Sequence, residues 1–385
     1  MKWSRQEGER ARTVATGPSV LIVAGTRPEA IKLAPLVWAL DGHRFLKAVV
    51  VNSGQHREAV RRTFAEFGIQ CHVELEALPA MPNLITSFEH MRVEMREVAA
   101  RFRPDLVMVQ GDTLTAYAAA VGSRDTGCTV GHVEAGLRTD TPSDPFPEEW
   151  FRRRIGRIAD LHFAPTHAAA QHLRAEGISL GAIHRTGNTG IDSLKWMLDR
   201  LAGEDTMPSR ARRVLVTLHR RENHDRNADT VCRALLRLSR AHPELSIVFP
   251  VHPNPRVANP IRRHLGTNTA FHLVAPMAYG DFIRTAAGAA LIISDSGGVQ
   301  EEAPHLGTPL LVPRCNTERP EGIATGFVNL VRVDESAIVA AAHAALLSPK
   351  APAVPIDGNA PFGAGDAAQR IVKVLEARVM ERACA

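Results

Sequence analysis

Three acidic segments carry residues that could exchange protons with a substrate. They occupy positions 110–113 (Gln-Gly-Asp-Thr), 132–139 and 145–149, and the first two directly follow short apolar runs. Two carboxylates in one cleft can divide into a proton acceptor and a proton donor when their environments separate their pKa values. A single acid in such a place is more often a helix cap, but three in succession favour catalysis. Asp112 and Glu134 are therefore the first candidates for an acid–base pair.

A first anion site is indicated at 25–29, Gly-Thr-Arg-Pro-Glu, directly after an apolar run. Gly25 permits a tight turn, and Pro28 suits the first turn of a helix, whose N-terminus attracts anions. Arg27 and, one turn further on, Lys32 add positive charge. On its own, the segment could equally be an ordinary helix start with an exposed arginine.

A second anion site is indicated at 296–298, Ser-Gly-Gly, after another apolar run. Adjacent glycines let a phosphate approach the backbone N–H groups of the following helix, and a serine adds a hydroxyl donor. A carboxylate further along that helix can reach a ribose diol, and Glu302 is better spaced for this than Glu301. A capped turn with acids favoured by the helix dipole is nearly as good an interpretation of this segment alone.

Histidine and arginine residues follow two more apolar runs. His219 and Arg220 belong to the segment 217–223, and His252 belongs to 250–255. Such side chains suit a diphosphate or proton transfer, although the chain holds 17 His and most are expected to be structural or exposed. The sequence has no HExxH, no Cys/His cluster and no GxGxxG after its first apolar run, so we expect neither a metal nor NAD as cofactor.

Short runs rich in Val, Ile and Leu supply the strands at whose ends these residues lie. The predicted strands are 20–24, 46–51, 105–109, 129–133, 161–164, 214–218, 245–250, 271–274, 290–294, 309–312 and 329–333. Continuous apolar strands separated by helix-length segments indicate parallel sheets covered on both faces, where ligands bind at the carboxyl ends of the strands. At 385 residues, the alternation predicts an α/β protein with two doubly wound domains.

A polar stretch at 201–213 interrupts the apolar periodicity and predicts a domain boundary. The segment 348–366 is rich in Pro, Gly and Ala and predicts a connector to a terminal helix. We therefore expect a flexible arm at 1–18, a Rossmann-like domain with the acidic motifs at 19–203, a second Rossmann-like domain at 204–360 and the terminal helix within 361–385.

The composition disfavours several other classes of protein. No apolar run approaches the ~20 residues of a membrane span, and the charged start lacks the apolar core of a secretory signal. Five scattered cysteines without a CxxC pair favour a reducing cytoplasm. The formal net charge is +5, but aromatic residues are only 5% and the arginines are dispersed, so we expect a small anionic ligand and no nucleic acid.

Taken together, these segments resemble the UDP-N-acetylglucosamine 2-epimerase family. The matching stretches, in family order, are GTRPEAIKLAPLV (25–37), GQH (54–56), QGDTLTA (110–116), GHVEAGLRT (131–139), PFPEE (145–149), FAPT (163–166), GNTGID (187–192), HRREN (219–223), PVHPNP (250–255), SDSGGVQEEAPHLGTPLL (294–311) and TERPEG (317–322). They cover most of the chain, and such an ordered set is highly specific.

The resemblance implies a glycosyltransferase-B-like architecture, in which two Rossmann-like domains face a cleft that holds a UDP-sugar and the C-terminal helix returns to the first domain. Non-hydrolysing members invert C2 of UDP-N-acetylglucosamine without NAD. They eliminate UDP to give a 2-acetamidoglucal and add it back to give UDP-N-acetylmannosamine. We expect this activity in a cytoplasmic homodimer that has no membrane or nucleic-acid partner.

The matching motifs indicate which residues of this chain correspond to the family's site residues. The resemblance assigns UDP binding to Arg27, Lys32, His219, Phe282, Ser296, Gly297, Gly298 and Glu302. It assigns the acid–base group to Asp112, Glu134, Glu148 and His219, with Arg152 in support.

Three alternatives stay open at this stage. One is the hydrolysing reaction of the same family, which releases UDP and free N-acetylmannosamine. Another is a UDP-sugar glycosyltransferase on the same fold, since fold does not determine function. The third is a catalytically silent nucleotide-binding protein. The pathway that uses the product also stays open between cell-wall polymer, capsule and secondary metabolite.

The sequence departs from the family pattern at two places. Phe151 stands where the PEExNR motif has Asn, and 72–84 lacks the polar and basic residues of bacterial members. In those members, the second stretch helps to bind an activating UDP-N-acetylglucosamine. Of that candidate activator site, Gln55, Arg220 and His252 are present, whereas 77–83 offers one polar side chain and Glu58 replaces a neutral amide.

We therefore predict that this protein needs no activator, because two anionic ligands in one cleft repel each other unless cations lie between them. Starting from purified UDP-N-acetylmannosamine, the reverse reaction should show hyperbolic kinetics and no lag. A pronounced lag that a trace of UDP-N-acetylglucosamine abolishes would show instead that the second site is intact.

Overall fold

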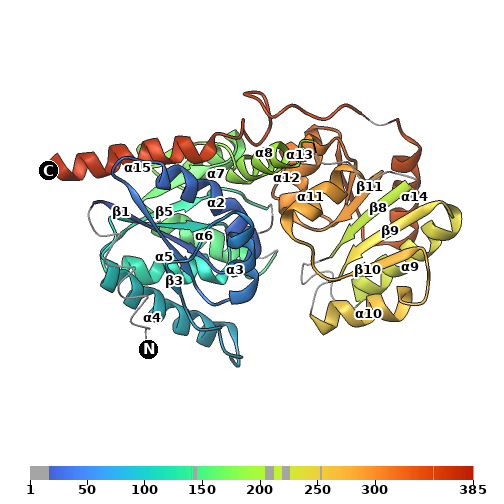
Figure 1. Ribbon diagram of the computed structural model, residues 1–385, viewed down its shortest axis with the longest axis horizontal. Helices are drawn as coiled ribbons and strands as arrows, with labels where there is room; N and C mark the ends of the chain where they lie inside the picture. Colours follow the sequence, from blue (N-terminus) through green and yellow to red (C-terminus); the bar gives the residue numbers. More distant parts are fainter. Residues whose placement is uncertain are drawn as a thin grey trace. The chain divides into compact units, whose positions relative to one another are not determined.

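The computed structural model describes residues 17–139, 141, 145–203, 212–218, 226–251, 254–349 and 351–384. The chain divides into two compact units (Figure 1), one made of the chain up to Ser193 together with Phe362–Ala385 and the other of Leu194–Pro361. The first boundary between the units falls inside helix α8 (Thr189–Leu201), before the polar stretch at 201–213 where the sequence predicted it. Because one continuous helix crosses this boundary, the apolar periodicity of the sequence shows no break there.

The first unit is built on a seven-stranded parallel sheet with the order β3-β2-β1-β4-β5-β6-β7. Its strands are β1 (Ser19–Ala24), β2 (Lys47–Asn52), β3 (Val73–Glu74), β4 (Leu106–Gln110), β5 (Thr129–Val133), β6 (Leu161–Ala164) and β7 (Ile183–Arg185). Its helices are α2 (Arg27–Asp41), α3 (Arg57–Glu66), α4 (Leu84–Phe102), α5 (Leu114–Arg124), α6 (Glu148–Ile158), α7 (His167–Ala175) and α15 (Ala367–Cys384), with the 3-10 helix η1 (Leu180–Ala182) before β7.

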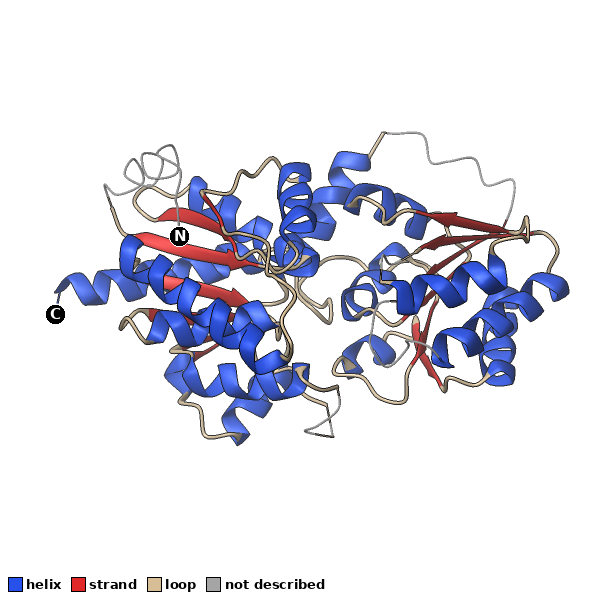
Figure 2. Ribbon diagram, turned by 90° about the horizontal axis from the view of Figure 1, so that it is seen from below, coloured by secondary structure: helices blue, strands red, loops and turns tan. Residues whose placement is uncertain are grey.

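The second unit holds a six-stranded parallel sheet with the order β10-β9-β8-β11-β12-β13. Its strands are β8 (Arg212–Thr217), β9 (Leu245–Pro250), β10 (Phe271–Val274), β11 (Leu291–Ser294), β12 (Leu310–Pro313) and β13 (Val328–Val331). The helices are α9 (Arg226–Ala241), α10 (Pro255–Leu265), α11 (Tyr279–Ala287), α12 (Gly297–Leu306), α13 (Pro320–Ala324) and α14 (Glu335–Leu347). Figure 2 shows helices on both faces of each sheet.

The expected fold class, two doubly wound α/β halves, is confirmed, and every predicted strand is present within about two residues of its expected bounds. Two strands were not predicted from the sequence, β3 and β7, which lie at the edges of the sheet and have 2 and 3 residues. Runs as short as these carry too few apolar residues to give a periodic signal.

The strand order reverses direction at an equivalent point in both sheets. β1 pairs with β2 on one side and with β4 on the other, and β8 likewise pairs with β9 and β11. The connections that leave these strand ends diverge to opposite faces, so a ligand can reach the sheet edge between them. The candidate residues after β1, β4 and β11 therefore lie at the positions that this topology opens.

Glu29 joins two of these strand ends inside the first unit. One carboxylate oxygen accepts the N–H groups of Gly25 (3.0 Å) and Thr26 (2.7 Å), and the other accepts the hydroxyl of Thr113 (2.6 Å), the N-cap of α5. Burial raises the pKa of Glu29 from its ordinary value of 4.5 to about 7. The hydrogen bonds lower the pKa, but their effect is smaller than that of burial. Glu29 thus ties the turn after β1 to the turn after β4.

We expect Glu29→Gln to remove part of the pH dependence of stability. The folded protein keeps a proton on Glu29 that the unfolded chain releases above pH 4.5, so this group stabilises the fold below that pH and loses its contribution as the pH rises through about 7. The loss should approach about 3 kcal/mol in the free energy of unfolding. Chemical denaturation between pH 5 and 8 measures it.

The exposed Glu97→Gln variant is the control, because Glu97 lies on α4 and its side chain is solvent-exposed. In Glu97→Gln the free energy of unfolding should fall with rising pH as in the wild type, whereas in Glu29→Gln this fall should be smaller. The same fall in both variants would show that Glu29 is already ionised in the folded protein across this range.

Candidate active site

Asp112 and Glu134 lie at neighbouring strand ends of the first unit. β4 and β5 are paired in parallel, with Gln110 opposite Val133, so the residues that follow them leave the sheet at the same edge. Glu148 is the first residue of α6 and is partly buried. The topology thus brings Asp112 and Glu134 to one sheet edge, as the spacing of the motifs predicts.

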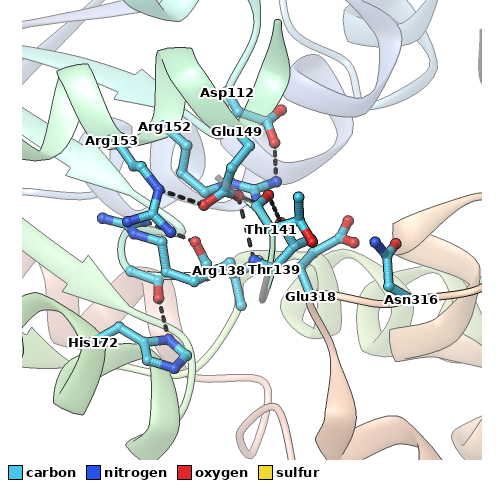
Figure 3. Close-up of polar contacts among 12 residues, drawn as sticks. Asp112, Arg138, Thr139, Thr141, Glu149, Arg152, Arg153, His172, Asn316 and Glu318 are labelled. Carbon is cyan, nitrogen blue, oxygen red and sulfur yellow. Dashed lines mark hydrogen bonds and ion pairs between the residues drawn. The ribbon is translucent and has the colours of Figure 1, made fainter. Parts of the chain in front are cut away.

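A buried guanidinium holds Asp112 in place. Arg152, on α6, is 3% exposed and donates to the carboxylate of Asp112 and, at 2.5 Å, to that of Glu149 (Figure 3). Glu149 is fully buried and also accepts from Arg153 (2.9 Å) and from the N–H of Thr139 (3.4 Å). Arg152 therefore fixes the positions of two carboxylates at once.

Glu149 was not predicted as a site residue, although its position on α6 carries a signal. Glu149, Arg152 and Arg153 are spaced at i, i+3 and i+4 on α6, the spacing at which helical side chains meet. The pairs could therefore have been predicted, but the extension of the network from Arg152 to Asp112 could not.

Glu134 is held in an unusual backbone conformation at the end of β5. Its φ is 65°, in the left-handed region that non-glycine residues seldom adopt, and the residue is 8% exposed. Its Oε2 atom accepts from Lys32 and, at 3.0 Å, from the side-chain amide of Asn188. The structure therefore places Lys32, which we had assigned to UDP, beside Glu134. Asn188 was missed by the sequence analysis.

His132 fixes the turn that presents Asp112. Its Nε2 atom lies 2.7 Å from the carbonyl oxygen of Gly111, a residue with a φ of 70°. Burial lowers the pKa of His132 to about 3, so the ring is neutral and this nitrogen donates its proton to the carbonyl. His132 is consequently a positioning group and no acid at neutral pH.

His172 on α7 and Glu176, the residue that follows α7, brace the segment after Glu134. Arg138 donates to Glu176 at 2.8 and 2.7 Å and to its neighbour's carbonyl, and His172 contacts the carbonyl of Gly136 at 3.0 Å (Figure 3). At Gly136 a β-carbon would lie 2.2 Å from a backbone oxygen of α7, so only glycine fits there. The acid after β5 thus stands on a rigid loop.

The glycine turn of the second unit follows β11 directly. Ser296 is the N-cap of α12, and its N–H donates to Ser294 Oγ at 3.1 Å. A β-carbon on Gly297 would lie 2.4 Å from a guanidinium nitrogen of Arg319, whereas Gly298 meets nothing closer than 4.0 Å. Gly297 is therefore needed because the buried Arg319 side chain packs against it. Gly298 leaves open space beside the backbone N–H groups.

Two adjacent acids on α12 have different partners. Glu301 is 1% exposed and pairs with Arg319 at 2.6 Å, and Arg319 in turn pairs with Glu318 at 2.5 Å. Glu302 accepts the phenolic hydroxyl of Tyr279 at 2.7 Å. Phe282 lies one turn after Tyr279 on α11 and is partly exposed. The two acids therefore differ in their partners, and the assignment of Glu302 to the ribose stays a prediction.

The chain matches known proteins along nearly its whole length. The family model for UDP-N-acetylglucosamine 2-epimerase matches residues 38–376. The probable UDP-N-acetylglucosamine 2-epimerase of Ralstonia solanacearum is 39% identical over 93% of this chain and 98% of its own, and the enzyme of Escherichia coli strain K12 is 38% identical with the same coverage. The chain belongs to the UDP-N-acetylglucosamine 2-epimerase family.

Solved structures of the family have the same fold. The UDP-GlcNAc 2-epimerase of Neisseria meningitidis bound to UDP-GlcNAc superposes with a TM-score of 0.88 at 34% identity, covering 93% of this chain and 100% of that one. S. aureus MnaA in a co-structure with UDP has a TM-score of 0.86 at 34% identity, over 94% and 97% of the two chains. The protein is accordingly an isomerase of the epimerase type.

The family resemblance raised a question about Phe151, which the structure answers. The Phe151 side chain is 3% exposed and stacks on Tyr117 of α5 with ring centroids 5.2 Å apart. Phe151 therefore packs α6 against α5. Glu148 still begins α6, with Arg152 one turn further along the helix.

The candidate activator residues of this epimerase are only partly described. Arg220 and His252 lie outside the described residues, as does His219, which the resemblance assigns to UDP binding and proton transfer. Gln55 Oε1 accepts from the N–H (3.1 Å) and the hydroxyl (2.8 Å) of Thr115, so this oxygen already has two partners. Glu58 is exposed and pairs with Arg61 and Arg62, each at 2.6 Å, and these arginines offset its charge.

The activator prediction therefore rests on the apolar segment 77–83 alone. That segment lies beside the GQH motif, because the N–H of Leu78 donates to the carbonyl of Gly54 at 2.9 Å.

Neither a metal site nor a membrane segment is found in the part of the chain that the structure describes. In these residues, no group of three or more His, Cys, Asp or Glu side chains could hold a metal ion. No helix among them combines the length and the apolar character needed to cross a membrane.

We predict that Tyr279→Phe lowers the affinity for UDP by about 3- to 10-fold, because Glu302 would lose a hydrogen bond that orients its carboxylate. If Glu302 binds the ribose hydroxyls, the affinity of Tyr279→Phe for 2′,3′-dideoxy-UDP should be close to that of the wild type. Glu302→Ala should lose more affinity for UDP and again little for the dideoxy nucleotide. Calorimetric titration with both nucleotides measures this. Thr285→Val is the matched control on α11, because its hydroxyl donates to the carbonyl of Asp281 on the same helix. Equal losses for the two nucleotides would contradict the assignment.

Proposed function

We propose that this epimerase interconverts UDP-N-acetylglucosamine and UDP-N-acetylmannosamine without hydrolysis. The observation that carries the proposal is the pair of carboxylates at the ends of β4 and β5, Asp112 and Glu134, each in contact with its own buried cation. Inversion at C2 requires a proton to leave one face of the sugar and to return on the other. Two acids fixed at one sheet edge supply two such groups.

The nucleotide would be bound by the residues after β1 and β11. Arg27 lies at the N-terminus of α2, and Ser296, Gly297 and Gly298 form the first turn of α12, where backbone N–H groups and the helix dipole favour a diphosphate. Glu302 would accept hydrogen bonds from the ribose, and Phe282 would contact the base. His219 would complete the diphosphate site.

The reaction would proceed by elimination and re-addition. A carboxylate removes the proton from C2 while the bond between C1 and the diphosphate oxygen breaks, which leaves a 2-acetamidoglucal and UDP. In the return step, a proton is delivered to the opposite face of C2, and the UDP oxygen bonds to C1 again. The negative charge on the leaving diphosphate must be neutralised as the proton departs, which is the role we assign to Arg27 and His219.

This route moves a proton and no hydride, and so we propose that neither NAD nor a metal takes part. We also propose that the enzyme acts as a homodimer in the cytoplasm. The four cysteines described, Cys71, Cys128, Cys232 and Cys315, are all free, which suits a reducing compartment. Light scattering on the purified protein tests the dimer.

The function predicts that C2 of the substrate exchanges with solvent. Incubation of UDP-N-acetylglucosamine in D₂O, without any acceptor, should place deuterium at C2 and give a second UDP-linked anomeric signal in the proton NMR spectrum. Free sugar together with UDP would indicate the hydrolysing reaction. No exchange at all would contradict the proposal and favour a transferase.

In the same assay, Asp112→Asn, Glu134→Gln and Glu148→Gln should each lower turnover by about 10²-fold or more while UDP affinity stays near that of the wild type. Arg27→Ala should weaken UDP binding instead. Glu97→Gln again serves as the exposed control. Near-normal turnover in all three carboxylate variants would show that these acids do not carry the reaction.

A further inference from the structure

One short segment of the first unit contacts both Glu134 and the returning C-terminal chain. The segment Gly187–Ser193, which we call the junction segment, joins β7 to the start of α8. The side-chain amide of Asn188 donates to Glu134 Oε2 at 3.0 Å, and the main-chain N–H of the same residue donates to the carbonyl of Phe362 at 2.7 Å. A single residue therefore connects a candidate catalytic carboxylate to the C-terminal segment.

The rest of the junction segment attaches α15 to the first unit. The buried carboxylate of Asp192 accepts the N–H groups of Ala367 (3.2 Å) and Ala368 (2.8 Å), the first two residues of α15. Gly187 has a φ of 89°, and a β-carbon there would lie 3.2 Å from the Cα of Gly363, so the two backbones are in close contact. These contacts bury and fix the start of the C-terminal helix.

A further contact leads from the junction segment to Lys32, the other partner of Glu134. The hydroxyl of Ser193 donates to the carbonyl of Ile31 at 2.6 Å, one residue before Lys32 on α2. α15 itself packs along α2. Lys32 and Asn188, which both donate to Glu134, thus lie on segments that the C-terminal chain touches.

The orientation of the Asn188 amide is determined by its neighbours. Its Oδ1 atom accepts the N–H of Gly190 at 3.0 Å, so the NH₂ group must be the part that faces Glu134. The residue is 2% exposed. Glu134 needs such a partner because its left-handed backbone is strained, and strained residues persist only where the surroundings over-determine them.

We propose that Asn188 is a positioning residue for Glu134 and that docking of the C-terminal segment sets the position of Asn188. The proposal rests on the function proposed above, in which Glu134 exchanges a proton with the sugar. Residues 362–384 then contribute to catalysis through Asn188, although they are far from Glu134 in the sequence.

The test measures kcat and KM for C2 exchange, UDP affinity and thermal unfolding for four variants. Asn188→Ala should lower kcat by about 10- to 100-fold, with KM and UDP affinity within about threefold of the wild type. Asn188→Asp keeps the shape of the residue but sets a second carboxylate against Glu134. It should move the acidic limb of the kcat–pH profile to higher pH.

Asp192→Asn weakens the attachment of α15 without touching Glu134. It should lower kcat by about 3- to 10-fold in protein that is fully folded at the assay temperature. Glu381→Gln is the control on α15, since Glu381 is exposed and its contact is with Arg378 on the same helix. It should leave every parameter unchanged.

The outcomes separate this inference from the proposed function. If wild-type protein exchanges C2 but folded Asn188→Ala keeps the wild-type kcat, the positioning role is wrong and the function stands. If Asn188→Ala does not fold, Asn188→Asp decides instead. A kcat–pH profile equal to that of the wild type in this variant would show that the positioning role is wrong. A lower melting temperature with normal kcat in Asp192→Asn would show that α15 only stabilises the fold. Absence of exchange in the wild type would reject the function itself.

Discussion

The acidic part of the site depends on the ion pair between Lys32 and Glu134. An ionised carboxylate as buried as Glu134 needs a cation in contact, because removing an isolated charge from water costs several kcal/mol. Lys32 reaches it from α2, and Glu29 fixes the first turn of α2 to the turn after β4. The ends of β1, β4 and β5 are therefore held in one arrangement by charges and hydrogen bonds that would be costly to leave unpaired.

The same rule of charge balance governs the other buried ions. Arg152 is shared between Asp112 and Glu149, so loss of either acid would leave a guanidinium only partly compensated. In the second unit, Arg319 lies between Glu301 and Glu318 and packs on Gly297. Arg152 and Arg319 thus each bind two acids, and these ion pairs hold the loops near β4 and β11 in place.

Much of this arrangement could be predicted from the sequence, because apolar runs locate the strands and parallel strands present their carboxyl ends at one edge. The partners of the site residues could not be predicted. Asn188 is 54 residues from Glu134 and Thr113 is 84 residues from Glu29, and no spacing rule links positions so far apart. Spacing favoured Glu302 over Glu301, but the physical difference between them lies in Tyr279 and Arg319, which only the fold brings to them.

The two units show why the fold alone could not have identified the chemistry. Both sheets reverse their strand order at an equivalent point, yet the residues at these points differ in kind. In the first unit, acids with buried cations follow β4 and β5, as proton transfer requires. In the second, a serine and two glycines begin helix α12 shortly after β11, and the N-terminus of a helix suits an anion. Nucleotide binding needs only the serine and glycines of the second unit. A transferase on this fold could therefore function without the paired acids of the first unit. In the function that we propose, the paired acids of the first unit, each held beside its own cation, would therefore distinguish this epimerase from a transferase of the same architecture.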